Sequence, residues 1–409
     1  MTSALDRFLK YVSYDTQSRE GADTYPSTPG QLVLLGDLVR DLQVIGVADA
    51  TIDEHGYVMA TVPATSSNGA IPSIGFIAHV DTSPEMSGAG VKPIVHRNYR
   101  GGDLVLPDDP EAVLRAADVP YLRECTGHDI VTASGTTLLG ADNKAGVAEI
   151  MTAAEYLLAH PEIPHGPIRI GFTPDEEVGQ GTRYFDVGRF GAKYAYTMDG
   201  GARGEFEFET FSADAMLIAF RGFNTHPGFA RGRMVNAIKL AARFIDRLPG
   251  DRLSPETTDG YDGFVHPSVV QASVDRTMVK LLIRDFVTRG LKEKEVWLES
   301  LAREVVAGVQ GASVEIQIEE SYRNMREIID QHPIVVERAR QAFAKAGVSI
   351  HERAIRGGTD GSKLSFMGLP TPNIFAGEQN FHSRLEWVSV QDMEKAVDVI
   401  VQIARVWAE

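Results

Sequence analysis

Apolar residues in the first half of the chain alternate between helical and strand-like spacing. Two amphipathic helices are predicted near the start, one by apolar positions 5, 8, 9 and 12 and the other by residues 31–46. Dense apolar runs at 73–81 and 167–173 predict strands covered on both faces, and residues 147–158 form a helical pattern between them. This order predicts an α/β fold with a mixed, mostly parallel sheet flanked by helices.

The pattern changes after about residue 207, where long alternating strands appear. Residues 211–223, 269–286 and 313–320 predict four strands, and two helices are predicted around 235–248 and 298–305. The order βαββαβ is that of a ferredoxin-like domain. The expected organisation is a catalytic domain in two parts, 1–208 and 323–409, with an inserted α+β lid domain at 209–322.

The style of the first half resumes after residue 322. A helix is predicted at 334–347, and the last helix is expected to begin at Ser389. Between them, the stretch RGGTDGS at 356–362 is predicted to be a Gly-rich loop, without the Lys of a nucleotide-binding P-loop.

Composition narrows the function classes. The chain has 409 residues, 43% hydrophobic and 23% charged, and its net charge of -16 comes with no basic cluster. Nucleic acid and anionic membranes are therefore not expected as partners, whereas short peptides and other small molecules are. A single cysteine, Cys125, excludes an internal disulfide, and neither a signal-peptide core nor a membrane-length apolar run is present. We expect a soluble, cytoplasmic protein.

Several apolar strands end in a histidine or a carboxylate. In open α/β sheets, ligands bind at the carboxyl ends of the strands, so residues at these ends can meet in one crevice. Taken singly, each residue has an ordinary structural explanation as a helix cap, a turn residue or a core histidine. Taken together, they predict a functional site formed by His79, Asp81, Asp142, Glu176, Glu177, Asp199 and His382.

The chemistry of this set favours a metal centre. Imidazole and carboxylate ligands without thiolate suit zinc, with cobalt or manganese as alternatives. One catalytic zinc ion needs fewer ligands, so we expect two ions that share a carboxylate and hold a bridging water as nucleophile. Asp81 lies two positions after His79 in an extended strand and can orient its imidazole.

The stretch FTPDEEVG places three carboxylates in a row after a predicted strand. Adjacent residues in extended backbone point in opposite directions, so Glu176 and Glu177 should do different jobs. Asp175 is then expected to be a solvated turn residue.

These motifs resemble those of the peptidase T branch of the dinuclear zinc peptidases and deacylases, the family that includes aminoacylase. The resemblance covers essentially the whole chain and is carried by HVDTSP, LLGADNKAG, FTPDEEVG, TMDGG and IRGGTDGSKLSFMGLPTPN. It implies a tripeptide aminopeptidase with two zinc ions per chain. It also implies a cis peptide bond between Asp142 and Asn143. Asn143 departs from the pattern of the family, whose other members carry Asp at that position. The implied ligands are Asp142 as the bridge, His79 with Asp199 at one ion, and Glu177 with His382 at the other.

The same resemblance implies roles for the remaining site residues. Glu176 would be the general base, and Asp81 would hold His79 in position. In the lid, His226 of the HPG motif would stabilise the developing oxyanion, while Asn236 and Arg284 would hold the substrate backbone or carboxylate. The residues alone favour structural roles instead, with His226 as a turn histidine and Arg284 in an ion pair with Asp285 or a neighbouring carboxylate.

Two rival functions remain open from the sequence. The same metal motifs serve N-acyl amino acid deacylases and dipeptidases, because these reactions also hydrolyse an amide. A metal-bearing peptide-binding protein without turnover is the second rival, and the presence of Glu176 argues against it. The sequence leaves open the physiological metal, the side-chain preference, the choice between monomer and homodimer, and whether His226 acts in its own chain or in a partner's.

Overall fold

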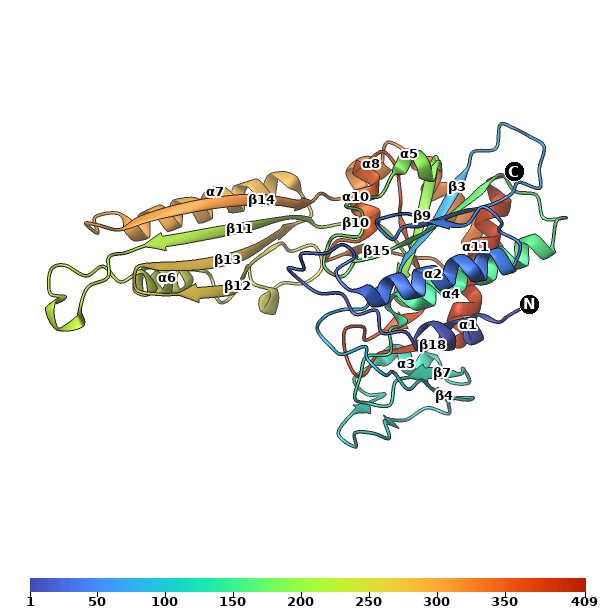
Figure 1. Cartoon of the computed structure of the whole chain (residues 1–409), viewed down its shortest axis with the longest axis horizontal. Helices are drawn as coiled ribbons and strands as arrows, with labels where there is room; N and C mark the ends of the chain where they lie inside the picture. The colour runs from blue at the N-terminus through green and yellow to red at the C-terminus, as the bar shows by residue number, and fades with distance from the viewer. The chain divides into compact units, whose positions relative to one another are not determined.

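The computed structural model describes residues 1–409 and divides them into two compact units (Figure 1). The first unit consists of Met1–Phe208, Glu327–Arg353 and Thr359–Glu409, and the second of Glu209–Arg326 with Ala354–Gly358. None of the helices combines the length and the apolar character that crossing a bilayer requires. The boundaries 1–208, 209–322 and 323–409 remain our proposal for the division into catalytic and lid domains.

The first unit is built on an eight-stranded sheet with the order β1-β2-β8-β3-β9-β16-β10-β15. Its centre is parallel, because β3 pairs in parallel with β8 and β9, and β9 with β16. Antiparallel pairs join β1 to β2, β2 to β8, and β10 to β16. The strands are β1 (Thr51–Ile52), β2 (Val58–Val62), β3 (Ile74–His79), β8 (Ile168–Thr173), β9 (Tyr194–Gly200), β10 (Glu205–Thr210), β15 (His351–Ile355) and β16 (Asn373–Phe375).

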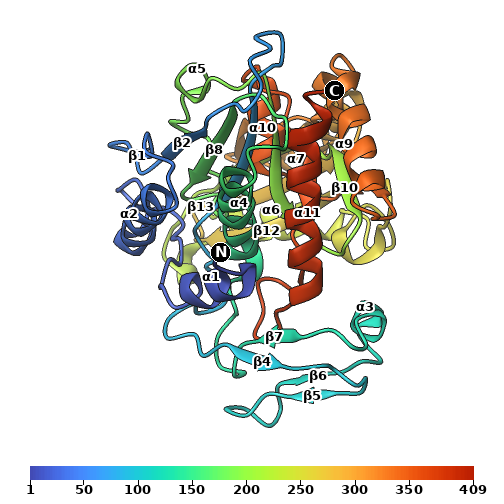
Figure 2. The same ribbon diagram turned by 90° about the vertical axis from the view of Figure 1, so that its right-hand side faces the viewer.

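Helices pack around this sheet, and Figure 2 shows α4 and α11 side by side. Ser389 caps α11 by accepting a hydrogen bond from the Asp392 N–H at 3.3 Å, as the sequence predicts. The helices of this unit are α1 (Ala4–Tyr11), α2 (Pro29–Val44), α3 (Pro120–Glu124), α4 (Ala141–Ala159), α5 (Val187–Phe190), α8 (Arg326–Ile329, which begins in the second unit), α9 (Pro333–Lys345), α10 (Asp360–Phe366) and α11 (Val390–Val406).

Alternate residues of the central strands pack on opposite faces of the sheet. Ile77 and Ala195 join a buried cluster with Leu364 of α10. Phe76 stacks on Tyr196 at a ring separation of 5.9 Å, and the Tyr196 hydroxyl donates a hydrogen bond to a carbonyl of α9. Both faces are therefore covered, as the dense apolar pattern predicts.

Two small sheets extend the first unit, and Figure 2 shows strands of both beneath α1, α4 and α11. One has the strand order β17-β18-β7-β4, and the other pairs β5 with β6. Their strands are β4 (Ile94–His96), β5 (Leu104–Val105), β6 (Val113–Leu114), β7 (Ile130–Thr132), β17 (Glu378–Gln379) and β18 (Trp387–Ser389).

The second unit has the predicted ferredoxin-like arrangement. Its antiparallel sheet has the order β12-β13-β11-β14, and α6 and α7 pack on it around a single apolar core. The order along the chain is β11 (Ser212–Arg221), η1 (Pro227–Phe229), α6 (Ala237–Asp246), η2 (Pro255–Thr257), β12 (Phe264–Ala272), β13 (Arg276–Asp285), α7 (Thr288–Val306) and β14 (Ser313–Tyr322).

The stretch 356–362 is not one Gly-rich loop, so that prediction is wrong in part. Thr359 caps α10, which begins at Asp360, and the Thr359 side chain accepts a hydrogen bond from the Gly361 N–H at 3.1 Å. The prediction missed the start of this helix because glycine is a poor helix former. The Thr cap and the Asp in the first turn both favour a helix and outweigh the glycines.

Candidate metal centre and active site

Three parallel strands carry side chains to one edge of the central sheet. His79 is the last residue of β3, Asp199 lies at the end of β9, and the turn with Glu176 and Glu177 follows β8. Because β3 pairs in parallel with both neighbours, these strand ends lie together. The strand-end pattern in the sequence therefore has a geometric basis.

Asp142 lies between two histidines. Its Oδ1 is 2.9 Å from His79 Nε2, and its Oδ2 is 3.2 Å from His382 Nε2. Asp199 Oδ1 is 3.3 Å from the same nitrogen of His79, and Glu177 Oε2 is 2.8 Å from that of His382. The five side chains thus form two histidine and carboxylate groups that share one carboxylate.

The donor atoms of this cluster fit metal ions. Ligand atoms of His79, Asp142 and Glu177 lie within 4.8 Å of one another, as do those of Asp142, Asp199 and Glu378. Glu177 Oε1 is buried without any hydrogen-bond partner, which is costly for a carboxylate unless a cation compensates. Imidazole nitrogens and carboxylate oxygens are the donor set of catalytic zinc and related divalent ions.

The electrostatics of the cluster are those of cation-binding groups. Burial by itself would lower the pKa of His382, but the carboxylates of Asp142 and Glu177 raise it to about 11. Burial, and after it the nearby charge of Asp142, raises the pKa of Glu177 to about 8. Burial also lowers the pKa of His79, but the carboxylates of Asp199, Asp142 and Asp81 together outweigh it and hold this pKa well above its ordinary value. Without metal, protons therefore compensate the buried carboxylates, and metal binding must displace them.

Asp81 connects His79 to the turn that carries the two glutamates. Its Oδ1 lies 3.3 Å from His79 Nδ1 and accepts the Glu176 N–H at 3.0 Å, while Oδ2 accepts the Glu177 N–H at 3.2 Å. Asp81 itself is fully buried. The carboxylate of Glu176 has no hydrogen-bond partner, and burial raises its pKa well above the ordinary value.

Asp175 is not a solvated turn residue, so that prediction is wrong. Its side chain is buried and accepts hydrogen bonds from Ser27 N–H at 2.6 Å and from Gln31 Nε2 at 2.7 Å. It also has a positive φ of 57°, and the residues after it form a turn in which the Gly179 N–H bonds to the Glu176 carbonyl. Glu176 and Glu177 therefore diverge within a turn and not along extended backbone.

The peptide bond between Asp142 and Asn143 is cis, as the resemblance predicts. Asn143 is fully buried, and its Oδ1 accepts a hydrogen bond from the Gly146 N–H at 3.2 Å. Gly140, in a left-handed conformation with φ 81°, begins the turn that leads into Asp142. The unusual asparagine thus has a helix-capping contact beside the shared carboxylate.

The sequence interpretation missed two buried glutamates next to the site. Glu386 accepts hydrogen bonds from the backbone N–H groups of Leu139, Gly140 and Asp142 at 2.7, 2.8 and 3.0 Å. Burial raises the pKa of Glu386 to about 7 in spite of these donors. The second is Glu378, which belongs to one of the ligand groups described above. It follows the buried strand β16, so the strand-end rule could have found it.

The predicted oxyanion-stabilising residue His226 and the predicted substrate-binding residues Asn236 and Arg284 lie in the second unit, where each has a local contact. His226 precedes η1, and its Nδ1 accepts the Gly228 N–H at 3.1 Å; the side chain is exposed. Asn236 caps α6. The guanidinium of Arg284 lies 5.3 Å from the ring centroid of Tyr322. Asp285, the neighbour considered as a partner for Arg284, pairs with Lys294 instead.

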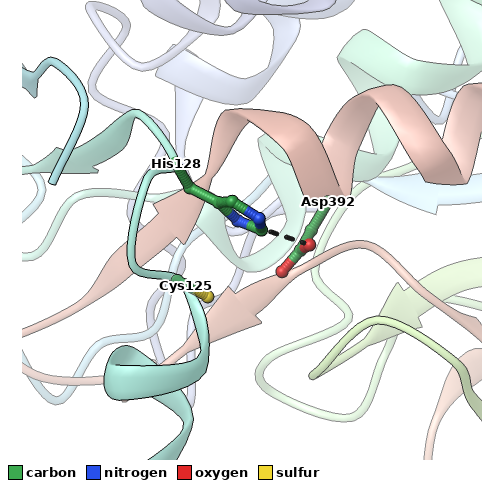
Figure 3. Close-up of side chains that lie close together, drawn as sticks. All are labelled: Cys125, His128 and Asp392. Atoms are coloured by element: carbon green, nitrogen blue, oxygen red, sulfur yellow. Dashed lines mark ion pairs between the residues drawn. The ribbon is translucent and has the colours of Figure 1, made fainter.

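A separate group of candidate ligands consists of Cys125, His128 and Asp392 (Figure 3). The histidine and the aspartate already have partners. His128 Nδ1 lies 2.8 Å from Ser389 Oγ, and Asp392 Oδ1 lies 3.4 Å from the guanidinium of Arg203. Burial, and then the charge of Asp392, raises the pKa of the thiol to about 12. A cation here would face the positive charge of Arg203, so we assign no metal to this group.

Comparison with known proteins agrees with this geometry. Residues 133–406 match the model of "Peptidase family M20/M25/M40". Peptidase T of Geobacillus sp. (strain WCH70) is 48% identical over 405 residues, covering 99% of this chain and 98% of that protein. Peptidase T of Bacillus subtilis (strain 168) is 48% identical over 401 residues, covering 98% and 97%.

Solved structures show the same fold. The aminopeptidase PepT from Bacillus cereus ATCC 10987 superposes with a TM-score of 0.76 at 23% identity, covering 99% of this chain and 98% of that one. A dinuclear metal-binding peptidase of the M20 family from Bacillus subtilis superposes with a TM-score of 0.65 at 15% identity, covering 98% and 97%. The chain therefore belongs to the peptidase family M20/M25/M40 and, within it, to the peptidases T.

Proposed function

We propose that this chain is a dinuclear metallo-aminopeptidase that releases the N-terminal residue of short peptides, above all tripeptides. The observation that carries the proposal is the position of Asp142, whose two oxygens face two histidines that each have a further carboxylate partner. The choice of substrate rests on the relatives, which are peptidases T and match this chain over nearly its whole length.

The proposed cofactor is zinc, with two ions per chain, and cobalt or manganese as substitutes. Two bound ions of this kind supply Lewis acidity and lower the pKa of a shared water towards neutrality. The proposed ligands are Asp142 to both ions, His79 and Asp199 to one, and Glu177 and His382 to the other. Each nitrogen and carboxylate of this set lies close enough to its partner to converge on a common ion.

Glu176 is the proposed general base. Its carboxylate is unpaired, the residue is half-buried, and it follows the same strand as the proposed ligand Glu177, so it can accept a proton from the attacking water and return it to the leaving amine. Asp81 is the proposed positioning residue for His79. By binding two backbone N–H groups of the glutamate turn, it would also fix the distance between the imidazole and Glu176.

The second unit would supply the contacts to the substrate. His226 uses only Nδ1 in its local hydrogen bond, which leaves Nε2 available as a donor to the developing oxyanion. Asn236 and Arg284 would hold the peptide backbone and its carboxylate. Whether His226 serves its own chain or a partner's is tested by mixing a His226→Ala chain with a Glu176→Ala chain, because only a shared site would regain activity.

The test is the requirement for a free terminal amine. Ala-Ala-Ala, its N-acetyl form, Ala-Ala and N-acetyl-alanine are offered separately to the zinc-loaded protein, with Glu176→Gln as the inactive control. The proposal expects release of free alanine from Ala-Ala-Ala alone or by a wide margin. Preferred hydrolysis of N-acetyl-alanine would indicate a deacylase, and preferred hydrolysis of Ala-Ala a dipeptidase. Binding of the tripeptide without turnover would indicate a peptide-binding protein.

A further inference from the structure

A further carboxylate, that of Glu378, reaches the metal centre from the segment that follows β16. One of its oxygens lies within 4.8 Å of oxygens of both Asp142 and Asp199. The residue is only 2% exposed, and its Oε2 is buried with no hydrogen-bond partner. The structure therefore places a buried carboxylate that has an unsatisfied oxygen beside the carboxylates proposed to hold one of the two ions.

The backbone around Glu378 is fixed against the strand that carries Asp199. The N–H groups of Ala376 and Gly377 donate to the carbonyls of Gly200 and Gly201 at 2.7 and 2.9 Å. Glu378 then enters β17, where it pairs with Val388 of β18. The side chain is thus held at the centre by regular backbone pairing and does not hang from a mobile loop.

Three buried carboxylates at such short distances repel one another strongly. On this side of the cluster the neighbouring nitrogen is His79 Nε2, which already lies 2.9 Å from Asp142 and 3.3 Å from Asp199. Moving an unpaired carboxylate out of water costs several kcal/mol of free energy or more, unless a cation or a proton compensates its charge. A divalent ion bound by one oxygen of each of the three carboxylates would compensate their charges and would give the Glu378 carboxylate a partner.

We propose that Glu378 is a sixth metal ligand, the third carboxylate on the ion held by His79, Asp142 and Asp199. The inference rests on the proposed function, since it assumes that this ion is present. It makes the two positions unequal, because one is formed by an imidazole and three carboxylates and the other by an imidazole and two. A position richer in oxygen also accepts harder ions such as manganese more readily.

The experiment compares metal binding by the full-length wild-type protein with that of Glu378→Gln, Glu378→Asp and the matched control Glu149→Gln. Glu149 is also a fully buried carboxylate without a partner, but it lies further along α4 and belongs to no ligand group. Metal is removed by chelation, and zinc and cobalt are titrated by calorimetry, with the visible absorption of cobalt as a second readout.

The wild type and Glu149→Gln should bind two ions, whereas Glu378→Gln should bind one of the two about 10- to 100-fold more weakly and change the cobalt spectrum. Glu378→Asp keeps the charge but shortens its reach by one methylene, so it should also bind that ion more weakly than the wild type. Affinities and spectra of both Glu378 variants equal to those of the wild type would overturn the inference and make Glu378 a neutral buried carboxyl group. A wild type that does not bind two ions would overturn the proposed function as well.

Discussion

Replacing Glu386 by alanine should loosen the segment that presents Asp142. The side chain is 1% exposed, and its carboxylate accepts three backbone N–H groups, those of Leu139, Gly140 and Asp142. Each buried N–H left without a partner costs about 1–3 kcal/mol, so three of them set a range of about 3–9 kcal/mol. We expect the lower end, because removing the carboxylate leaves room for a water molecule that can accept some of these hydrogen bonds.

Glutamine at the same position makes a graded control. Its carbonyl oxygen can replace Oε2, which accepts two of the N–H groups, but its amide nitrogen would face the third, that of Asp142. Glu386→Gln should therefore cost about 1–3 kcal/mol, roughly a third of the alanine effect. Both variants should also weaken metal binding, by about 10- to 100-fold, because Asp142 loses the group that orients its backbone.

The assay is urea unfolding of the metal-free proteins at pH 8, followed by zinc titration of each. The pH matters because burial raises the pKa of Glu386 to about 7, so the carboxylate of the wild type is ionised only above that value. The wild type should have the highest urea midpoint, Glu386→Gln an intermediate one and Glu386→Ala the lowest. If Glu386→Ala unfolds at the wild-type urea concentration and binds both ions equally well, the three hydrogen bonds do not hold the Asp142 segment.

Four further results are expected. Glu176→Ala should keep both ions but lose about 100- to 10,000-fold in turnover, and Glu177→Ala should lose one ion; the reverse metal contents would exchange the two roles. His226→Ala should lower turnover by about 100- to 1000-fold at unchanged metal content, and full activity would leave it as a turn residue. Chelation should abolish hydrolysis and zinc or cobalt should restore it, whereas activity in protein shown by elemental analysis to be metal-free would contradict the mechanism. Burial raises the pKa of Glu149, so its carboxyl group favours the folded state below its ordinary pKa and this advantage is lost as the pH rises. Glu149→Gln should thus gain stability relative to the wild type as the pH rises above about 4.3, the ordinary pKa of glutamate. Stability curves of the two proteins that stay parallel over this rise would exclude a raised pKa at Glu149.

The part of the site that lies at strand ends could be predicted from the sequence. His79 and Asp199 each end a long apolar run, so period and polarity together locate them at one edge of a parallel sheet. Glu386 escaped the same reasoning because its partners are backbone N–H groups 244 to 247 residues earlier in the chain. Glu378 was missed because the strand before it, β16, has only three residues and gives a weak pattern.

Asp175 shows a different limit of sequence reasoning. Three adjacent carboxylates normally indicate a segment exposed to solvent. The hydrogen-bond donors that stabilise the buried carboxylate of Asp175 come from residues 27 and 31, 148 and 144 positions earlier in the chain. The sequence around Asp175 therefore gives no sign of them. The lid residues present a third case, because His226, Asn236 and Arg284 have ordinary local contacts in their own unit, and their role in binding substrate stays a prediction.

The strand order of the central sheet has a consequence for synthesis on the ribosome. The strand β16 lies between β9 and β10, although β10 follows β9 directly in the chain. Roughly 170 residues must be added after β9 before β16 exists, which takes about 9–35 s at 5–20 residues per second. Throughout that interval the facing edges of β9 and β10 are unpaired, and such edges can join to strands of other nascent chains. All strands of the second unit's sheet are synthesised before β16. The second unit can therefore fold first, whereas the sheet that carries the site can be completed only after β16 has been made.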